Sequence, residues 1–458
     1  MIDTDLKIFE RELIEVIDLF DKGDELKIRH RFVDKGDRYV NTITVNGKVY
    51  AYGNLIPKNI NEIETKRLTK RYAKLSLYKA LSRFLNVEQP WGALTGIRPT
   101  KLAYSLIEQG EDFFGEFVDT FKVSREKTRV VLDIINSQKK YYEKDVDNTD
   151  LFVFIPFCPS RCKYCSFICQ DVKSARMHIE EYVDVLIKEI KESVKYIKKL
   201  RSIYIGGGTP VSLSNQLLEK ILVEIDKVNT GVEFTVEAGR PDRITIETLQ
   251  LLKKYRVTRI CINPQTFNDK TLQLIGRNHT AEDVIEKYNL AKETFSVNMD
   301  FIAGLDGESF QDFKYSIDKA IELSPDNITV HTLCVKKGSY LASETKRLDS
   351  GEVAKMIDYA SLTLKENGYN PYYMYKQKYM AANLENVGYS KSGRECVYNI
   401  DTMEEICHVV ACGANSISKV VNFEQNRIER YAAPKDVKSY IDKIDKILEC
   451  KTLLFEQK

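Results

Sequence analysis

From residue 151 onward, six short apolar runs alternate with longer amphipathic segments. The apolar runs, which we predict to be strands, cover residues 151–157, 202–205, 233–238, 258–262, 296–302 and 327–333. Strands that alternate with helices in this way pair in parallel through right-handed crossovers. The sequence therefore predicts an α/β fold containing a partial, TIM-like (β/α)6 barrel. The chemistry of such a barrel sits at the carboxyl ends of its strands.

The rest of the chain differs from this pattern, and 458 residues exceed what one hydrophobic core usually serves. We expect an N-terminal α+β domain over residues 1–145, the barrel over 146–368 and a C-terminal α+β extension over 369–458 that closes the barrel and substrate region. In the N-terminal part, Asn46-Gly47 predicts a hairpin turn. Helical periodicity covers about 63–85 and 123–141. The sequence does not indicate the role of residues 1–145.

The composition argues against several classes of partner. Lys and Arg number 69 and Asp and Glu 67, a net charge of +2. We therefore expect no general attraction to nucleic acid or anionic lipid. Because no long apolar run and no signal-peptide pattern is present, we expect a cytoplasmic protein without membrane contacts. In that reducing compartment, the ten cysteines are expected to be metal ligands or buried thiols rather than disulfides.

Three cysteines follow the first predicted strand. Cys158, Cys162 and Cys165 have the spacing C-x3-C-x2-C. A cubane iron–sulfur cluster is usually held by four cysteines, so a compact set of three would leave one iron open to a small molecule. The alternatives are buried thiols, or a zinc site completed by Cys169. We favour the cluster and expect Cys169 not to be a ligand.

A glycine run, Gly206-Gly207-Gly208-Thr209-Pro210, follows the second predicted strand. Glycine allows close approach of the backbone to a ligand and permits positive φ. Free backbone polar groups there could hold the ammonium and carboxylate of an amino acid. A tight turn between strand and helix would give the same pattern. Because the glycine run lies one strand–helix unit after the cysteine triad, we favour ligand binding.

Together, the cysteine triad and the glycine run resemble the radical S-adenosylmethionine (SAM) superfamily. The resemblance implies a 4Fe-4S cluster whose open iron chelates the amino and carboxylate groups of SAM. It further implies that an electron from the cluster cleaves SAM, and that the resulting 5′-deoxyadenosyl radical takes hydrogen from a substrate. A flavodoxin or ferredoxin would supply the electron. The barrel around such a radical must be dry and preorganised.

Residues 150–335 more closely resemble the oxygen-independent coproporphyrinogen III oxidases (coproporphyrinogen dehydrogenases). The matching runs stand in that family's order, at 155–158, 206–210, 233–237, 263–268, 276–277 and 298–304. Segments 91–101 and 373–389 look like the HemZ-type branch, which also carries an extra N-terminal domain. The substrate that the family implies is a tetrapyrrole, coproporphyrinogen III or a relative.

The resemblance implies roles for residues by position. The three cysteines would hold the cluster, and Gly207 and Glu237 would contact SAM, with the Glu237 carboxylate at the ribose diol. The residues that would surround the SAM sites, including a second SAM, are Tyr164, Gly208, Thr209, Gln265, Arg277, Asp300 and Val330. As alternatives, Glu237 and Asp300 could cap strand ends, and Arg277 could form a surface salt bridge.

The chain departs from this family beside the cluster. The coproporphyrinogen oxidases carry Tyr-x-His where this chain has Phe152 and Phe154, and a fourth cysteine where it has Phe167. Relatives that act as haem chaperones share the last change. We expect an enzyme that decarboxylates two propionates of coproporphyrinogen III to vinyls, giving protoporphyrinogen IX in haem biosynthesis. A haem-binding chaperone with a cluster, or another radical reaction on a tetrapyrrole, remains the alternative.

The C-terminal part contains three weaker signals. The gaps between Cys396, Cys407 and Cys412 match no compact ligand pattern, so we expect buried free thiols rather than an auxiliary cluster. The aromatic and basic run 372–379 could flank a flat tetrapyrrole, or form an edge strand with a solvated basic face. His331, at a predicted strand end, could face the cavity or be a satisfied core histidine.

Overall fold

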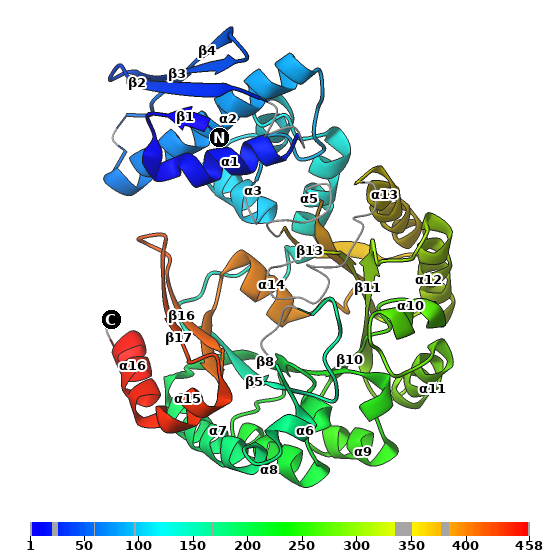
Figure 1. Ribbon diagram of the computed structural model, residues 1–458. Coiled ribbons are helices and arrows are strands. Elements are labelled where there is room, and N and C mark those ends of the chain that lie inside the picture. The colour runs from blue at the N-terminus through cyan, green and yellow to red at the C-terminus, as the bar shows by residue number, and fades with distance from the viewer. Residues whose placement is uncertain are drawn as a thin grey trace. The chain divides into compact units, whose positions relative to one another are not determined.

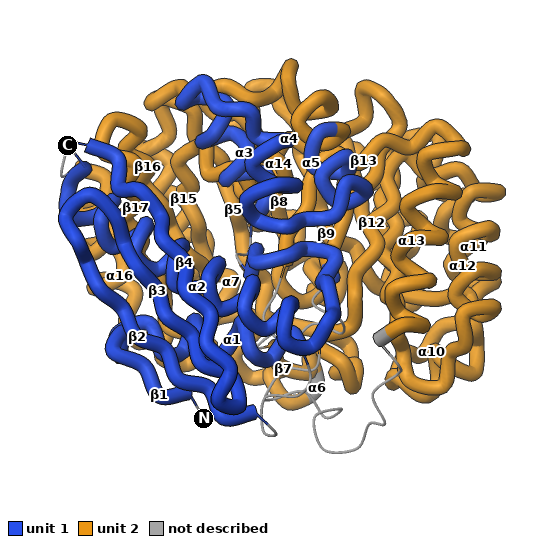
Figure 2. The backbone as a smooth tube through the Cα atoms, turned by 90° about the horizontal axis from the view of Figure 1, so that it is seen from above, with its two compact units in different colours: residues 1–132, 382–384 blue, residues 133–381, 385–458 orange. Residues whose placement is uncertain are grey.

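The computed structural model describes residues 2–20, 26–58, 60–95, 98–165, 169–334, 350–376 and 384–456. The chain divides into two compact units (Figure 2). One comprises residues 1–132 and 382–384, and the other residues 133–381 and 385–458. The division into three domains, with boundaries at 145 and 368, stays a prediction. Among the described helices, none combines the length and the apolar character needed to cross a bilayer.

The first unit contains a four-stranded sheet covered by helices. Its strands, in spatial order, are β1 (Ile2–Thr4), β2 (Ile28–Asp34), β3 (Arg38–Val45) and β4 (Lys48–Leu55). Its helices are α1 (Glu10–Asp18), α2 (Glu62–Leu85), α3 (Pro99–Glu108), α4 (Phe113–Gly115) and α5 (Arg125–Gln138), whose last residues belong to the second unit. Asn46 and Gly47, with φ of 47° and 85°, form the β3–β4 turn. The predicted hairpin and both predicted helices, α2 and α5, are therefore confirmed.

The second unit is built on an 11-stranded sheet (Figure 1). The six predicted strands are present as β5 (Asn148–Ile155), β8 (Lys199–Gly207), β9 (Glu233–Gly239), β10 (Arg259–Ile262), β11 (Ser296–Ala303) and β12 (Asn327–Thr332). Neighbours among them pair in parallel. A seventh parallel strand, β15 (His408–Cys412), pairs with β5. The α/β class with a parallel sheet is confirmed.

Antiparallel strands extend this sheet at both ends. They are β13 (Asn370–Tyr375) and β14 (Asn386–Ser390) beyond β12, and β16 (Ile417–Asn422) and β17 (Arg427–Ala432) beyond β15. A separate parallel pair, β6 (Phe157–Cys158) and β7 (Gln170–Asp171), joins the two ends of the cysteine loop. Within the described residues, β13 and β17 are the edge strands of this sheet, and the sheet itself is curved (Figure 1).

The helices of the second unit are α6 (Val172–Ala175), α7 (Ile179–Ser193), α8 (Asn215–Asp226), α9 (Ile246–Lys254), α10 (Asp269–Leu274), α11 (Ala281–Ala291), α12 (Phe310–Leu323), α13 (Ser350–Glu366), α14 (Val397–Glu404), α15 (Val437–Asp442) and α16 (Ile444–Glu456). Helices α7, α8, α9, α11 and α12 lie outside the curve of the sheet, and α14 lies inside it (Figure 1). Tyr398 of α14 stacks on Tyr204 of β8, with ring centroids 4.3 Å apart.

The C-terminal segment holds more regular structure than predicted. An aromatic strand and a closing helix were expected and are present as β13 and α16. The segment expected to form loops between them instead contributes β14, β15, β16, β17 and α14. Strand β15 has only five residues, and α14 is enclosed by the sheet rather than lying on its surface. The strand is too short, and the helix lacks the apolar and polar faces of a surface helix, so neither has a clear periodic pattern in the sequence.

Candidate active site

One cavity of about 580 Å³ lies on the inner side of the curved sheet, at the carboxyl ends of the parallel strands. Residues from the strands β5, β8, β9, β10, β11, β12, β13 and β14 line it, together with the cysteine loop and α14. All of these residues belong to the second unit. A volume of this size is typical of a pocket for a small-molecule ligand or cofactor.

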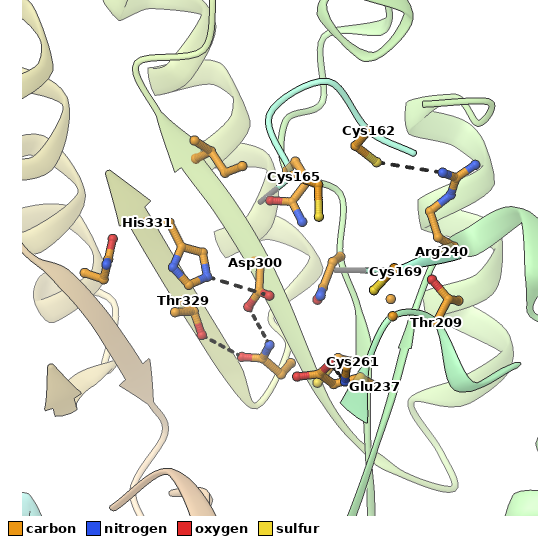
Figure 3. Close-up of a pocket in the computed structure, with 18 of the residues that line it drawn as sticks. Cys162, Cys165, Cys169, Thr209, Glu237, Arg240, Cys261, Asp300, Thr329 and His331 are labelled. Atoms are coloured by element: carbon orange, nitrogen blue, oxygen red, sulfur yellow. Dashed lines mark hydrogen bonds and ion pairs between the residues drawn. The ribbon is translucent and has the colours of Figure 1, made fainter. Parts of the chain in front are cut away.

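The loop after β5 brings the three predicted cluster ligands to the cavity wall. Cys158, Cys162 and Cys165 all line the cavity, and Figure 3 shows Cys162 and Cys165 on this loop. The Sγ atom of Cys162 lies 3.8 Å from Nη1 of Arg240. A cation beside a thiol favours the thiolate, which is the form that binds metal. Three thiols on one wall suit a cluster that leaves one metal position open to the cavity.

Cys169 lies on the same wall, beside Cys158. A hydrogen bond from the Cys169 thiol, assisted by Thr209, lowers the pKa of Cys158 to about 7, and the pKa of Cys169 itself is raised. That Cys169 is not a cluster ligand stays a prediction. Phe167 lies outside the described residues.

The glycine turn after β8 packs tightly against the cysteine loop. A Cβ atom on Gly208 would lie 2.5 Å from the Phe157 carbonyl oxygen and 3.0 Å from Cys158 Sγ. At Gly207, where φ is +107°, a Cβ would lie 2.9 Å from the ring of Phe154. Only glycine fits at these two positions without displacing the loop that carries the thiols.

The backbone N–H groups of this turn already have protein acceptors. The N–H of Gly208 donates to the Ile155 carbonyl and that of Thr209 to the Phe157 carbonyl, both at 2.7 Å. The N–H of Gly207 donates to Glu237 at 3.2 Å. The expectation of free backbone polar groups here was therefore wrong for these three N–H groups, because they join the turn to β5, β6 and β9 instead.

Glu237, on β9, projects its carboxylate into the cavity. It accepts hydrogen bonds from the Tyr204 hydroxyl at 2.6 Å and from Gly207. Burial raises the pKa of Glu237 to about 7, although the hydrogen bond from Tyr204 opposes the shift. The group can therefore be neutral or charged near neutral pH. The alternative was that Glu237 only caps a strand end. That role would not require its carboxylate to line a cavity, as it does here.

Asp300 and His331 face each other from β11 and β12 (Figure 3). Their Oδ2 and Nε2 atoms are 3.7 Å apart. Asp300 also accepts a hydrogen bond from Asn298 at 2.8 Å, and His331 Nδ1 lies 3.3 Å from the Tyr375 hydroxyl. Burial alone would raise the pKa of Asp300, but His331 and Asn298 together lower it. Asp300 therefore stays charged, and the expectation that His331 faces the cavity is confirmed.

Arg277 is buried rather than exposed, so a surface salt bridge is excluded for it. Its guanidinium donates to the Tyr164 hydroxyl and the Asn263 carbonyl, both at 3.0 Å. Gln265, with φ of 71°, presents a buried Oε1 atom that has no hydrogen-bond partner among the described residues. A buried acceptor without a partner costs free energy, so this atom is available to a ligand that carries a donor group.

Val330 lies apart from the other predicted SAM residues. It is buried and pairs with Phe301 of β11 and Val387 of β14. It is not among the described residues that line the cavity, whereas Thr329 and His331, its neighbours on β12, are. Successive side chains of a strand point to opposite faces, which explains the difference. A contact between Val330 and SAM stays a prediction.

Tyrosines form a further part of the cavity, which the sequence revealed only in part: the aromatic run 372–379 was a candidate for flanking the substrate, whereas Tyr204 and Tyr398 were not. The tyrosines in question, all cavity-lining, are Tyr204, Tyr372, Tyr373, Tyr375 and Tyr398. Burial raises the pKa of each one, so they remain neutral phenols. The inward position of Tyr204 follows from alternation along its predicted strand. That of Tyr398 depends on the enclosed helix α14, for which the sequence has no signal.

Lys376, a basic residue of the run 372–379, does not lie on a solvated face. Lys376 is only 2 % exposed, so the edge-strand alternative is wrong for this side chain even though β13 is indeed an edge strand. Lys378 lies outside the described residues. Cys396, Cys407 and Cys412 are buried free thiols, as expected.

Comparisons with known proteins agree with this geometry. Residues 152–320 match the Radical SAM superfamily. The oxygen-independent coproporphyrinogen-III oxidase-like protein HemZ of Bacillus subtilis (strain 168) is 35% identical over 442 residues, which cover 91% of this chain and 88% of that protein. The heme chaperone HemW of Lactococcus lactis subsp. lactis (strain IL1403) is 35% identical over 231 residues, covering 48% and 60%.

A solved structure shows the same fold. The coproporphyrinogen III oxidase HemN from Escherichia coli, described as a radical SAM enzyme, superposes with a TM-score of 0.54 at 20% identity. The superposition covers 69% of this chain and 72% of that one.

Proposed function

Because the chain belongs to the radical SAM superfamily and to its HemZ-type coproporphyrinogen oxidase-like family, we propose that it converts coproporphyrinogen III to protoporphyrinogen IX without oxygen. Proteins of this superfamily use a 4Fe-4S cluster and SAM. One observation carries the proposal: three thiols, a glycine turn, two carboxylates and a tyrosine-lined compartment open into a single cavity. The thiols, the glycine turn and the carboxylates suit the cofactors, and the tyrosine-lined part suits a flat substrate.

The proposed reaction removes a carboxyl group from each of two propionate side chains. Each propionate loses one hydrogen atom from its β-carbon, one electron, which passes to an external electron acceptor, and carbon dioxide, which leaves a vinyl group. When bound, the cluster and SAM supply the radical that takes the hydrogen atom. The task of this chain is then to hold the substrate carbon beside that radical and to keep water and other hydrogen donors away.

Different residues of the cavity would hold the cluster and SAM. Cys158, Cys162 and Cys165 would hold the cluster. Glu237 would accept hydrogen bonds from the ribose hydroxyls of SAM, with its orientation fixed by Tyr204 at 2.6 Å. The unpaired Oε1 of Gln265 would accept from the adenosyl part of the ligand. These roles use only acceptors and thiols that line the cavity.

Aromatic side chains favour a tetrapyrrole on the other side of the cavity. Phe152 stacks almost parallel on Tyr398, at an interplanar angle of 12°, and both line the cavity. Flat apolar surfaces of this kind suit pyrrole rings. The phenol and imidazole that the family carries in place of Phe152 and Phe154 would be supplied here by Tyr204 and His331, which also line the cavity.

A second candidate function is that of a haem carrier. Phe152 and Phe154 support it, since no Tyr-x-His pair stands beside the thiols. Similarity to the HemW chaperone also supports it but covers only 48% of this chain. The HemZ relative covers 91% and therefore includes the N-terminal unit, so we rank the enzyme first.

Anaerobic reconstitution tests the proposal. The iron-loaded protein is reduced in the presence of SAM and coproporphyrinogen III, and the products are analysed by mass spectrometry. We expect 5′-deoxyadenosine together with two successive losses of carbon dioxide and two hydrogens from the porphyrinogen. Cleavage of SAM with an unchanged porphyrinogen would refute the enzyme. Stoichiometric haem binding, seen as a Soret band in a parallel titration, would then support the carrier.

A further inference from the structure

Three side chains that can bind metal meet where α14 joins the sheet, outside the cavity described above. Asp150 lies on β5, Asp401 on α14, and Cys407 between α14 and β15. One carboxylate oxygen of each aspartate and the thiol sulfur all lie within 4.8 Å of one another. The three residues are 0%, 1% and 2% exposed. Because these acidic and thiol side chains are buried, they cannot be explained as ordinary charged groups of the protein surface.

Hydrogen bonds within the protein leave part of this set unused. Asp150 accepts from the Ser202 hydroxyl at 2.6 Å, and Asp401 accepts from Nε of Arg201 at 2.6 Å. Their remaining oxygens, Asp150 Oδ2 and Asp401 Oδ1, are buried and have no hydrogen-bond partner among the described residues. Each buried acceptor left in this state costs about 1–3 kcal/mol.

The charges of the cluster are also unbalanced. Two carboxylates face one guanidinium, that of Arg201, which also pairs with Glu143 at 3.3 Å. Burying an uncompensated charge is unfavourable. If the Cys407 thiol ionises and a divalent cation joins the two carboxylates and Arg201, the charges of these buried groups sum to zero; the Glu143 side chain, 58% exposed, is left to the solvent.

We propose that Asp150, Asp401 and Cys407 bind a thiophilic divalent cation, for which Zn²⁺ is the best match. Zinc accepts thiolate and carboxylate ligands together, and its tetrahedral ligands stand roughly 3.3–3.8 Å apart; the ligand atoms of this set, all within 4.8 Å of one another, need only a small approach to reach that spacing. Magnesium and calcium prefer oxygen ligands alone. Three protein ligands leave a fourth position for water.

The position of the site favours a structural metal site rather than a second reaction centre. It joins α14 to β5 and to the segment that leads into β15. Helix α14 also carries Tyr398, which lines the cavity and stacks on Tyr204. The cation would therefore hold in place the helix that forms the aromatic side of the cavity.

Metal analysis of the full chain tests this proposal. Because the cluster cysteines can themselves bind zinc, the measurement uses the chain with Cys158, Cys162 and Cys165 replaced by serine. We expect one zinc per chain in this background. After the further change Cys407→Ser, we expect the affinity for zinc to fall roughly tenfold or more. No zinc in the background, or zinc that survives Cys407→Ser, would overturn the proposal in favour of two carboxyl groups sharing a proton.

A matched variant and a second measurement complete the test. Cys396 is also a buried thiol beside a carboxylate, with its Sγ 3.2 Å from Glu233, so Cys396→Ser should retain the zinc. X-ray absorption at the zinc edge needs no Cys407 variant and keeps the test valid if Cys407→Ser does not fold. One sulfur with oxygen neighbours supports the site, and a shell of three or four sulfurs overturns it.

Discussion

At the scale of single residues, Glu237 links pH to ligand binding. Burial raises its pKa to about 7, so the carboxylate form dominates above that pH and the neutral form below it. The carboxylate is the better acceptor for two ribose hydroxyls. We therefore expect the affinity of the cluster-loaded protein for SAM, measured by anaerobic equilibrium dialysis, to rise severalfold from about pH 6 to about pH 8.

The variant Glu237→Gln separates this effect from the titration of SAM itself. Glutamine keeps the shape and an acceptor oxygen but does not ionise. Its pH profile should retain only the contribution of SAM. Parallel profiles for the two proteins would show that Glu237 does not titrate in contact with the ligand.

Among the cysteines, substitution should separate ligands from neighbours. Cys162→Ser should lose the iron and the visible absorption of the cluster after reconstitution, because a cubane held by two thiolates lacks a ligand. Cys169→Ser is the matched control, since Cys169 lies on the same wall beside Cys158. Iron and sulfide analysis provides the measurement. An equal loss of iron in Cys169→Ser would instead make Cys169 a ligand.

Residue spacing predicted the site where its parts are local in sequence. Cys158, Cys162 and Cys165 were found because a cluster loop needs close spacing along the chain. The approach of Arg240 to Cys162 and of His331 to Asp300 was not found, since each depends on how neighbouring strands and loops align. A continuous apolar run lacks the alternation of apolar and polar residues by which the face and register of a strand can be inferred from sequence.

At the scale of elements, the turn after β8 determines how closely the cysteine loop can approach the sheet. In Gly208→Ala, the new Cβ would lie 2.5 Å from a backbone oxygen and 3.0 Å from Cys158 Sγ. Overpacking of this kind typically costs about 1–3 kcal/mol. We expect a lower free energy of unfolding in urea and reduced cluster retention. Gly53→Ala, whose Cβ would meet only a flexible arginine side chain at 4.0 Å, should change neither; unchanged cluster retention in Gly208→Ala would contradict the account.

The C-terminal helix α16 is joined to the barrel by a buried ion pair. Lys451 lies 2.7 Å from Glu189 of α7, and both are almost fully buried. Lys451→Met would leave the Glu189 charge buried without its partner, at a cost of about 3–5 kcal/mol. We expect this loss in urea unfolding, and part of it should return in the double variant with Glu189→Gln. An unchanged midpoint in Lys451→Met would show that the pair does not stabilise the fold.

Elements were predicted from sequence in proportion to their length and repetition. Strands β5, β8, β9, β10, β11 and β12 recur with helices between them, and this repetition revealed the barrel. Strand β15 and helix α14 occur once each, near the end of the chain. Both are positioned by contacts with distant strands, so the sequence predicted neither.

At the scale of the whole molecule, the curved sheet brings distant segments to one cavity. Residues from the cysteine loop near the start of the barrel and from α14 near the end of the chain line the same space. The class of fold and the cofactors followed from the sequence. The substrate did not, because the aromatic side of the cavity is assembled from β8, β13 and α14, which lie far apart in the chain.

Transfer of a labelled hydrogen atom tests the proposed function most directly. Coproporphyrinogen III carrying deuterium at the β-carbons of its propionates is incubated anaerobically with the reduced, cluster-loaded protein and SAM. If the protein performs the proposed reaction, deuterium appears in 5′-deoxyadenosine and the porphyrinogen loses carbon dioxide to the same extent. Unlabelled 5′-deoxyadenosine with an intact porphyrinogen would contradict it.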